Sequence, residues 1–432
     1  MIGLEGGADK PRPLLLWSVE GEGFVMASDT TVLAFTGAFG SGCTESAKHL
    51  RDERAFKYIA LSSPLRSMWA KQNGSIEPQR FDLQKLGDQL RREKGLAVLV
   101  DLALEECDSS EKQIVIDGVR NLGEIQGLRE RFGYRFTLFS ILSAPDARWN
   151  RISSKYTDKK LTRRDFDDDD ERDRDEETPY GQQVELCLDK ADILINNQDP
   201  VSLGDFKKKV LAYVDLVLGT KPRGATKQEI LMSMAFASSH SSKCLKRHVG
   251  ALVVDVRGQV VGVGYNENPI GTNPCMEEPT YDGKCYRDII RNQHFEDLSS
   301  RGARCPKCGE PLKHKEGPPW RCGACLDKGS KTNLESFFFP DRAMSWCTAV
   351  HAEVSAILAA AERARDGTLY TTTFPCFQCA EKITQAGIKT IYFSEAYPDP
   401  HSGKRLELSG IELRQFEGVR SASMERFFPR PS

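Results

Sequence analysis

The chain has 432 residues, of which 39% are apolar and 28% are charged, and its formal net charge is −2. At about 100–200 residues per domain, this length predicts two or three domains, each able to bury a core. A nearly neutral chain has no global attraction for nucleic acid, so any polyanion site must be local. The sequence has no run of about 18 apolar residues, which argues against a membrane partner. We expect a cytoplasmic protein.

The first half of the chain has the pattern of an α/β domain. Residues 1–30 are rich in Gly, Pro and Glu and predict a poorly ordered N-terminal arm. Apolar strand patterns, separated by helical ones, follow at residues 31–36, 57–61, 114–117, 135–142 and 192–196. Such alternation is typical of a mainly parallel sheet covered on both faces, which we place at residues 31–218. The charge run at residues 163–177 predicts a solvated loop or helix face, or a mobile lid.

The second half contains a separate α/β pattern. Residues 219–226 combine Gly, Pro and basic residues and suit a linker. A helical pattern runs from residue 227 to about 237, and two strand patterns follow at residues 250–256 and 259–265. Regular patterning then stops between residues 271 and 340 and returns at about residue 345. We place the second domain at residues 219–432.

Two short motifs in the second domain predict a catalytic metal site. They are His351-x-Glu353 and Pro375-Cys376-x-x-Cys379, which together form the signature of zinc nucleobase deaminases. Zinc takes nitrogen and thiolate ligands in a tetrahedron, and a catalytic site leaves the fourth position to a water whose pKa the metal lowers. We expect His351, Cys376 and Cys379 to bind Zn²⁺. Glu353 is the predicted proton shuttle between water, ring nitrogen and leaving amine.

The local pattern around these motifs supports the same assignment. Residues 350–362 favour a helix that starts at the first motif, and a second helix starts at the second motif. Strand patterns at residues 368–374 and 388–393 complete a β-α-β unit that brings the motifs together. Helix N-termini favour thiolate and hydroxide. A lone C-x-x-C could be a redox pair or part of a structural zinc site, but the joint pattern favours the catalytic interpretation.

Further segments resemble a known family. They are residues 244–251 (CLKRHVGA), 264–271 (GYNENPIG) and 374–388 (FPCFQCAEKITQAGI). With the zinc motif, they make residues 227–428 similar to the deoxycytidylate deaminase branch of the cytidine deaminase superfamily. The resemblance implies an α/β/α domain with a five-stranded mixed sheet, and assembly as a homo-oligomer. It also implies that Asn266 contacts the sugar or base, an interpretation that the motif context favours over residues 266–268 forming only a turn.

Three other side chains are candidate substrate contacts. Lys246 and Arg247, flanked by Lys243 and His248, could meet phosphates or could simply be exposed basic residues. Tyr397 is a candidate wall for the pyrimidine ring, because an aromatic face stacks well on a base.

The whole chain resembles a narrower group, the bacterial two-domain dCTP/dCMP deaminases of anti-phage defence. Residues 180–187 (YGQQVELC) and 191–196 (ADILIN) add to the match. The resemblance implies a P-loop kinase-like domain joined to a deaminase domain. It implies hydrolytic deamination of dCTP or dCMP to the deoxyuridine nucleotide plus ammonia, which would deplete deoxycytidine nucleotides during infection. It also implies a restraint on activity, by an inhibitory RNA or by a regulatory nucleotide at the first domain.

Residues 37–44 (GAFGSGCT) form a degraded P-loop between a strand and a predicted helix. The positions that carry this interpretation are Gly37, Gly40, Gly42, Cys43 and Thr44, with Cys43 in place of the lysine. Without that charge we do not expect kinase activity, although backbone N–H groups can still bind phosphate and Thr44 can still reach Mg²⁺. Asp117, which ends an apolar strand, is the expected partner of the metal. The domain could sense a nucleotide, or it could be a scaffold that binds nothing.

Four cysteines predict a second metal site. Cys305 and Cys308 form one C-x₂-C pair and Cys322 and Cys325 another, within an insertion at about residues 300–330. Four thiolates close the coordination shell, so we expect a zinc ribbon with structural Zn²⁺. Disulfides are the alternative, disfavoured in a cytoplasmic protein. The remaining Cys275, Cys285, His294 and Cys347 could form another site or be ordinary side chains.

Two other functions fit the same signature. A deaminase of single-stranded DNA or RNA needs a groove with interleaved basic and aromatic residues. The C-terminal stretch offers Arg414, Phe416, Arg420, Arg426 and Phe427 for such a groove. The second alternative is a nucleotide sensor that has lost catalysis, against which the intact zinc ligands and Glu353 argue.

Overall fold

The computed structural model describes residues 29–153, 162–174, 178–198, 200–312, 346–394 and 400–429, together with residues 322, 325, 334 and 338. Most of the predicted N-terminal arm and all of the segment around Tyr397 lie outside these residues. No helix within them has both the length and the apolar character needed to cross a bilayer.

The first sheet has six strands, and five of them are parallel, as the sequence predicted. Its order is β11-β5-β4-β1-β3-β2. The parallel strands are β1 (Thr31–Thr36), β2 (Lys57–Ala60), β3 (Gln113–Asp117), β4 (Phe136–Leu142) and β5 (Ile193–Asn196). The helices of this half are α1 (Cys43–Arg54), α2 (Ser63–Asn73), α3 (Arg80–Lys94), α4 (Val98–Glu105), α5 (Leu122–Phe132), α6 (Pro145–Ser153), α7 (Arg163–Arg174), α8 (Val184–Asp189) and α9 (Leu203–Val217), with a short 3₁₀ turn, η1 (Gly133–Arg135).

Both faces of this sheet are buried, which explains why its strands are almost uninterrupted apolar runs. Side chains alternate along each strand, so Leu33 and Phe35 face α1 and α9 while Val32 and Ala34 face α4, α5 and α8. The charge run at residues 163–174 is helical rather than a loop. Phe166 is buried, which fixes α7 against the domain.

The second sheet has five strands of mixed direction. Its order is β10-β9-β8-β6-β7. The strands are β6 (Gly250–Val254), β7 (Val260–Tyr265), β8 (Thr368–Thr371), β9 (Thr390–Phe393) and β10 (Glu412–Gln415). The helices of this half are α10 (Lys227–Ser239), α11 (Tyr286–Ser300), α14 (Ala352–Ala360), α15 (Phe377–Ala386), α16 (Pro400–Leu408) and α17 (Met424–Phe427), with 3₁₀ turns η2 (Pro279–Tyr281), η3 (Ala361–Ala364) and η4 (Ser421–Ser423).

Glycines let helices approach both faces of this sheet closely. A Cβ at Gly262 or Gly264 of β7 would clash with backbone oxygens of α14, and a Cβ at Gly250 of β6 would clash with the backbone of α10. The sheet is therefore enclosed between α10 on one face and α14 and α15 on the other. This is the α/β arrangement expected for the second half, and it puts the N-terminus of α14 beside the sheet edge formed by β7.

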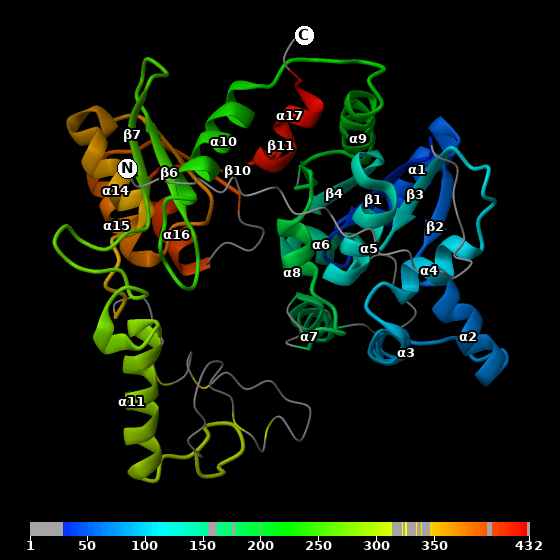
Figure 1. Cartoon of the computed structure of the whole chain (residues 1–432), viewed down its shortest axis with the longest axis horizontal. Coiled ribbons are helices and arrows are strands. Elements are labelled where there is room, and N and C mark those ends of the chain that lie inside the picture. The colour runs from blue at the N-terminus through cyan, green and yellow to red at the C-terminus, as the bar shows by residue number, and fades with distance from the viewer. Residues whose placement is uncertain are drawn as a thin grey trace, which may run out of the picture.

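The C-terminal segment joins the two sheets. After β10, only Phe416 and Glu417 separate the second sheet from β11 (Gly418–Val419), which pairs antiparallel with β5 of the first sheet. Figure 1 shows α10, β11 and α17 in the region between the two sheets. The expected division at residue 219 did not include this return, because a strand of two residues has no readable periodicity.

Candidate active site

Two helix N-termini carry the predicted metal ligands. His351 is the N-cap residue of α14 and Cys376 is the N-cap residue of α15, and Cys379 lies in the first turn of α15. β8 ends at Thr371 and the chain then leads directly to Cys376, while α14 and α15 pack against each other. The β-α-β prediction is confirmed here, because β8, α15 and β9 follow one another and β8 pairs parallel with β9.

The three ligand atoms have the separations that a zinc site requires. His351 Nδ1 lies 3.2 Å from Cys379 Sγ and 3.4 Å from Cys376 Sγ. All three ligand atoms lie within 4.8 Å of one another. In a tetrahedral site with zinc–sulfur bonds of about 2.3 Å and zinc–nitrogen bonds of about 2.0 Å, the ligand atoms lie at similar distances from one another. One imidazole and two thiolates therefore fit Zn²⁺ and leave one coordination position to water or substrate.

The protonation pattern of the site also suits a metal. Hydrogen bonding from Cys379, together with the neighbouring His351, lowers the pKa of Cys376 to about 4. The hydrogen bond to Cys376 raises the pKa of His351, although burial opposes it, and the pKa of Cys379 is raised by its bond to Cys376 and by burial. The lowered pKa favours the thiolate form of Cys376, the form in which cysteine binds metals.

Glu353 lies beside the ligands in the first turn of α14. Its side chain is only 3% exposed, and its Oε2 atom is 3.6 Å from Cys379 Sγ. Burial raises the pKa of this carboxyl group above its ordinary value. A buried carboxyl group next to the metal ligands is positioned to exchange protons with a reacting water.

Supporting residues around the second motif had no signal in the sequence. Ser402 on α16 is fully buried, and its hydroxyl donates to the carbonyl oxygen of Pro375 at 2.6 Å. Phe374 packs edge-on against Phe393 of β9, with ring centroids 4.8 Å apart. These contacts fix the turn that presents Cys376, and they come from segments far along the chain.

Asn266 lies close to the metal site but is already hydrogen bonded. It is 8% exposed, its Oδ1 accepts from the Val249 N–H at 2.7 Å, and its Nδ2 donates to the Arg247 carbonyl at 2.9 Å. The next residue, Glu267, forms a two-way backbone bridge with Val350, directly before His351. Asn266 therefore fixes the segment before β6, and its contact with sugar or base stays a prediction.

Two of the basic residues are paired with acidic residues that precede the insertion. Lys246 forms an ion pair with Asp288 on α11, and Lys243 forms one with Glu277 at 2.7 Å. A phosphate would have to compete with these carboxylates, so a phosphate role for Lys246 and Arg247 remains a prediction. Tyr397 lies outside the described residues.

The four insertion cysteines converge as a second group. Cys305 Sγ is 3.8 Å from Cys325 Sγ, and Cys308 Sγ is 3.4 Å from Cys322 Sγ. All four sulfur atoms lie within 4.8 Å of one another. A disulfide needs sulfurs about 2.05 Å apart, so these are separate thiols.

The unassigned cysteines and histidine do not join a metal group within the described ranges, where only the two groups above gather three or more ligand side chains. Cys275, Cys285 and Cys347 are free thiols there, and His294 stacks on Trp346 with ring centroids 4.9 Å apart. The interpretation as ordinary side chains fits these contacts.

The glycine-rich loop of the first domain has the predicted position between β1 and α1. Gly40 and Gly42 have positive φ angles of 82° and 116°, conformations that favour glycine. Burial raises the pKa of Cys43, which starts α1, to about 12, so this thiol is neutral. The thiol lies 3.4 Å from Ser41 Oγ instead of supplying the charge of a lysine.

Thr44 and Asp117, the two residues expected to bind Mg²⁺, are hydrogen bonded to each other. Thr44 Oγ1 donates to Asp117 Oδ2 at 2.7 Å, and Tyr58 donates to the same oxygen at 3.0 Å. Burial raises the pKa of Asp117. Binding of nucleotide or Mg²⁺ at this loop stays a prediction.

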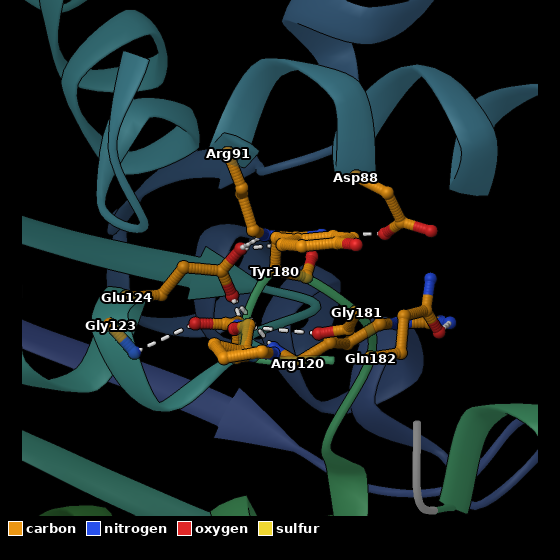
Figure 2. Close-up of polar contacts among 10 residues, drawn as sticks. Asp88, Arg91, Arg120, Gly123, Glu124, Tyr180, Gly181 and Gln182 are labelled. Atoms are coloured by element: carbon orange, nitrogen blue, oxygen red, sulfur yellow. Dashed lines mark hydrogen bonds and ion pairs between the residues drawn. The ribbon is translucent and has the colours of Figure 1, made fainter. Parts of the chain in front are cut away.

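A buried polar network elsewhere in the first domain was missed from the sequence (Figure 2). Glu124 is fully buried, accepts from Arg91 at 2.8 Å through one oxygen, and accepts from the backbone N–H of Arg120 and Asn121 through the other. The Asn121 side chain donates to the carbonyls of Pro179 and Gly181, both at 2.8 Å. The network fixes the segment before α8 against the loop that follows β3.

The C-terminal basic and aromatic residues do not form an exposed groove. Phe416 is 1% exposed. Arg420 donates to the carbonyls of Leu188 and Asp189, and Arg426 donates to the Phe136 carbonyl and to Thr137. Phe416, Arg420 and Arg426 are therefore engaged within the fold and are not available to the predicted polynucleotide groove.

Comparison with known proteins agrees with the metal site. Residues 225–395 match the family model described as the cytidine and deoxycytidylate deaminase zinc-binding region. The deoxycytidylate deaminase of Schizosaccharomyces pombe is 29% identical over 230 residues, covering 52% of this chain and 54% of the yeast protein. The Saccharomyces cerevisiae deoxycytidylate deaminase is 28% identical over 188 residues, covering 43% of each chain. The chain thus spans about half the length of these curated relatives.

A solved structure also matches part of the chain. The dCMP deaminase from cyanophage S-TIM5, in complex with dCMP and dUMP, is 22% identical and aligns with 44% of this chain and 96% of its own. Its TM-score of 0.26 is too low for a comparison of folds. The three convergent ligand atoms lie within residues 225–395, the segment that is similar to the zinc-binding region of cytidine and deoxycytidylate deaminases.

Proposed function

We propose that the protein hydrolyses the amino group of a deoxycytidine nucleotide, dCMP or dCTP, to give the deoxyuridine nucleotide and ammonia. The observation that carries this proposal is the close grouping of His351, Cys376 and Cys379 around a buried glutamate, within a segment that matches the deaminase family. The relatives with printed activities are deoxycytidylate deaminases, which supports a deoxycytidine nucleotide as substrate.

The chemistry follows from the residues. Zinc, when bound by the three ligands, acts as a Lewis acid that activates water for attack on C4 of the cytosine ring. Glu353 takes a proton from that water and gives it to the ring nitrogen N3. It then takes the second proton and gives it to the leaving amine, so that water and the amino group end as a carbonyl oxygen and ammonia. Burial keeps bulk water from replacing the carboxylate in these transfers.

A nucleotide panel tests this function. Purified zinc-loaded protein would be incubated with dCMP, dCTP, CMP and a cytosine-containing single-stranded oligodeoxynucleotide, and the uracil products measured by liquid chromatography. We expect turnover of dCMP, dCTP or both. Turnover of the oligonucleotide alone would favour a polynucleotide deaminase, and no turnover of any substrate would favour a non-catalytic nucleotide sensor.

We also propose that the insertion binds a second, structural zinc ion. The four sulfur atoms of Cys305, Cys308, Cys322 and Cys325 support this proposal, because their spacing suits a closed tetrahedral shell. The described part of the insertion has a small apolar cluster, formed by Phe295, Leu312 and Leu334 around the thiols. Such a core is too small to fold without metal.

The wider biological role rests on the resemblance of the whole chain. We propose that depletion of deoxycytidine nucleotides defends a bacterium against phage, and that the chain acts in the cytoplasm as a homo-oligomer. A regulatory nucleotide with Mg²⁺ at the P-loop domain, or an inhibitory RNA, would restrain the enzyme before infection. Plaque counts on cells that express the wild-type protein or Glu353→Gln test the role, and equal counts would contradict it.

A further inference from the structure

Residues 196–198, at the end of β5, are connected to the glycine-rich loop of the first domain through Asn197. Asn197 is 6% exposed, and its Nδ2 donates to the Ser41 carbonyl at 2.7 Å. Its own backbone is held on both sides, because its N–H donates to the Leu142 carbonyl and its carbonyl accepts from Arg151 at 2.7 Å. Asn197 therefore links residues 196–198 to the loop at residues 37–42.

The two neighbours of Asn197 contact the second domain. Asn196 Nδ2 donates to the Gln415 carbonyl at 2.9 Å, and Gln198 Nε2 donates to Gln415 Oε1 at 3.0 Å. The Asn196 N–H donates to Glu417 at 2.8 Å, and Lys209 bonds both the Asn196 carbonyl and the Glu417 carboxylate. Gln415 ends β10, so the edge strand of the deaminase sheet is fixed from the first domain.

From β10 the contacts continue to a metal ligand. Gln415 pairs with Phe393 of β9, and the next N–H, that of Phe416, donates to the Phe393 carbonyl at 2.7 Å. The Phe393 ring packs against Phe374, which precedes Pro375 and the ligand Cys376. Every step of this route is a hydrogen bond or a ring contact between buried or half-buried groups.

We propose that residues 196–198 couple the conformation of the loop at residues 37–42 to the geometry of the catalytic metal site. They act as positioning residues, and the proposal rests on the deaminase function proposed above. One face of this short segment contacts the loop through Asn197, and its neighbours bind Gln415. A change in the loop that moves the Ser41 carbonyl then changes the position of β10, of Phe393 and of the turn before Cys376.

A glycine in the loop allows a test without any ligand. Gly42 has φ 116°, and a Cβ at this position would lie 2.9 Å from Asn197 Nδ2. Gly42→Ala therefore pushes directly on the proposed coupling residue. Gly95 is a matched control, because it has a similar φ of 105° in the same domain and a Cβ there would meet nothing within 4 Å.

We expect Gly42→Ala to lower kcat for the preferred nucleotide by about 2-fold to 30-fold while zinc content stays at the wild-type level. Gly95→Ala also places an alanine at a positive φ, but it should leave kcat unchanged. Asn197→Ala removes the amide nitrogen against which the added methyl group would press. Gly42→Ala should therefore lower kcat clearly less in the Asn197→Ala background than in the wild-type protein. Equal effects of Gly42→Ala in the two backgrounds, or the same loss from Gly95→Ala, would overturn the proposal.

A second readout does not depend on turnover. Cobalt-substituted protein absorbs visible light, and its spectrum depends on the geometry of the ligands around the metal. Subtracting the wild-type spectrum from the Gly42→Ala spectrum removes the contribution of the four-cysteine group. We expect a difference spectrum for Gly42→Ala and none for Gly95→Ala. If wild-type protein turned over no nucleotide, the proposed function would fail and these spectra would still decide the coupling. Identical spectra for all variants would refute it.

Discussion

Replacing Glu353 by Gln is the sharpest test of the proposed chemistry. The amide has nearly the same shape as the carboxyl group, so it fills the same buried space, but it cannot accept and release a proton. The side chain is 3% exposed, and bulk water therefore has no ready access to take over as base. Positioned general acid–base groups contribute about 10²–10⁴ in rate, or about 2.7–5.4 kcal/mol at 1.36 kcal/mol per decade. We expect kcat to fall by a factor in that range.

Zinc content separates this effect from damage to the metal site. None of the three ligand atoms belongs to Glu353, so the variant should keep its metal and its melting temperature close to the wild-type values. Ammonia release and uracil formation would be followed together with zinc measured by mass spectrometry. Glu362→Gln, an exposed change just after α14, is the matched control. A Glu353→Gln enzyme that keeps its metal and turns over within about threefold of wild type would show that another group moves the proton.

Three further predictions concern metal binding and stability. Cys325→Ser should lower bound zinc from about two to about one per chain, as measured by mass spectrometry. Arg91→Met should cost about 3–5 kcal/mol in denaturant unfolding, because it leaves the fully buried Glu124 without its cation. Burial alone raises the pKa of Glu229, but hydrogen bonds, chiefly from Arg223, outweigh it and hold the pKa below 4.5. The stability that Glu229 contributes should be present above pH 4.5, be lost as the pH falls below it, and be absent in Glu229→Gln.

Matched substitutions define what would contradict these predictions. Cys107→Ser changes a cysteine of the first domain outside both metal groups and should keep the full zinc content. Lys94→Met and Glu407→Gln change exposed charges and should shift the free energy of unfolding by less than about 0.5 kcal/mol. Unfolding curves of Arg91→Met or Glu229→Gln that match these controls would show that the buried pairs do not stabilise the fold.

The metal site was predictable because its information is local. Each motif sits at the start of one helix, and the residue types in His351-x-Glu353 and Pro375-Cys376-x-x-Cys379 follow from what zinc binds and from what the proton transfers need. The five parallel strands of the first sheet were also predicted, since strands buried on both faces are continuous apolar runs. The positions of β6 to β9 were likewise predicted from apolar strand patterns.

The long-range contacts were not predictable from the sequence. The hydrogen bond from Ser402 to the Pro375 carbonyl joins residues 27 apart, and a serine in a short helix carries no sign of such a role. The bonds from residues 196–198 to Gln415 span about half of the chain, and β11, with two residues, is too short for a periodic pattern. The charge run at residues 163–174 forms a helix because one apolar residue, Phe166, anchors it, a detail that net polarity conceals.

The C-terminal return has a practical consequence for anyone who wishes to separate the halves. A cut at residue 219 would strip β11 from the first sheet and leave β5 with an unpaired border, and the excised deaminase would carry a tail whose partners are gone. Arg420 and Arg426 would lose the backbone carbonyl oxygens to which they now donate hydrogen bonds. A stable deaminase fragment would therefore need the tail redesigned as well as the cut, and a gene fusion or swap of the first half would have to carry residues 418–428 with it.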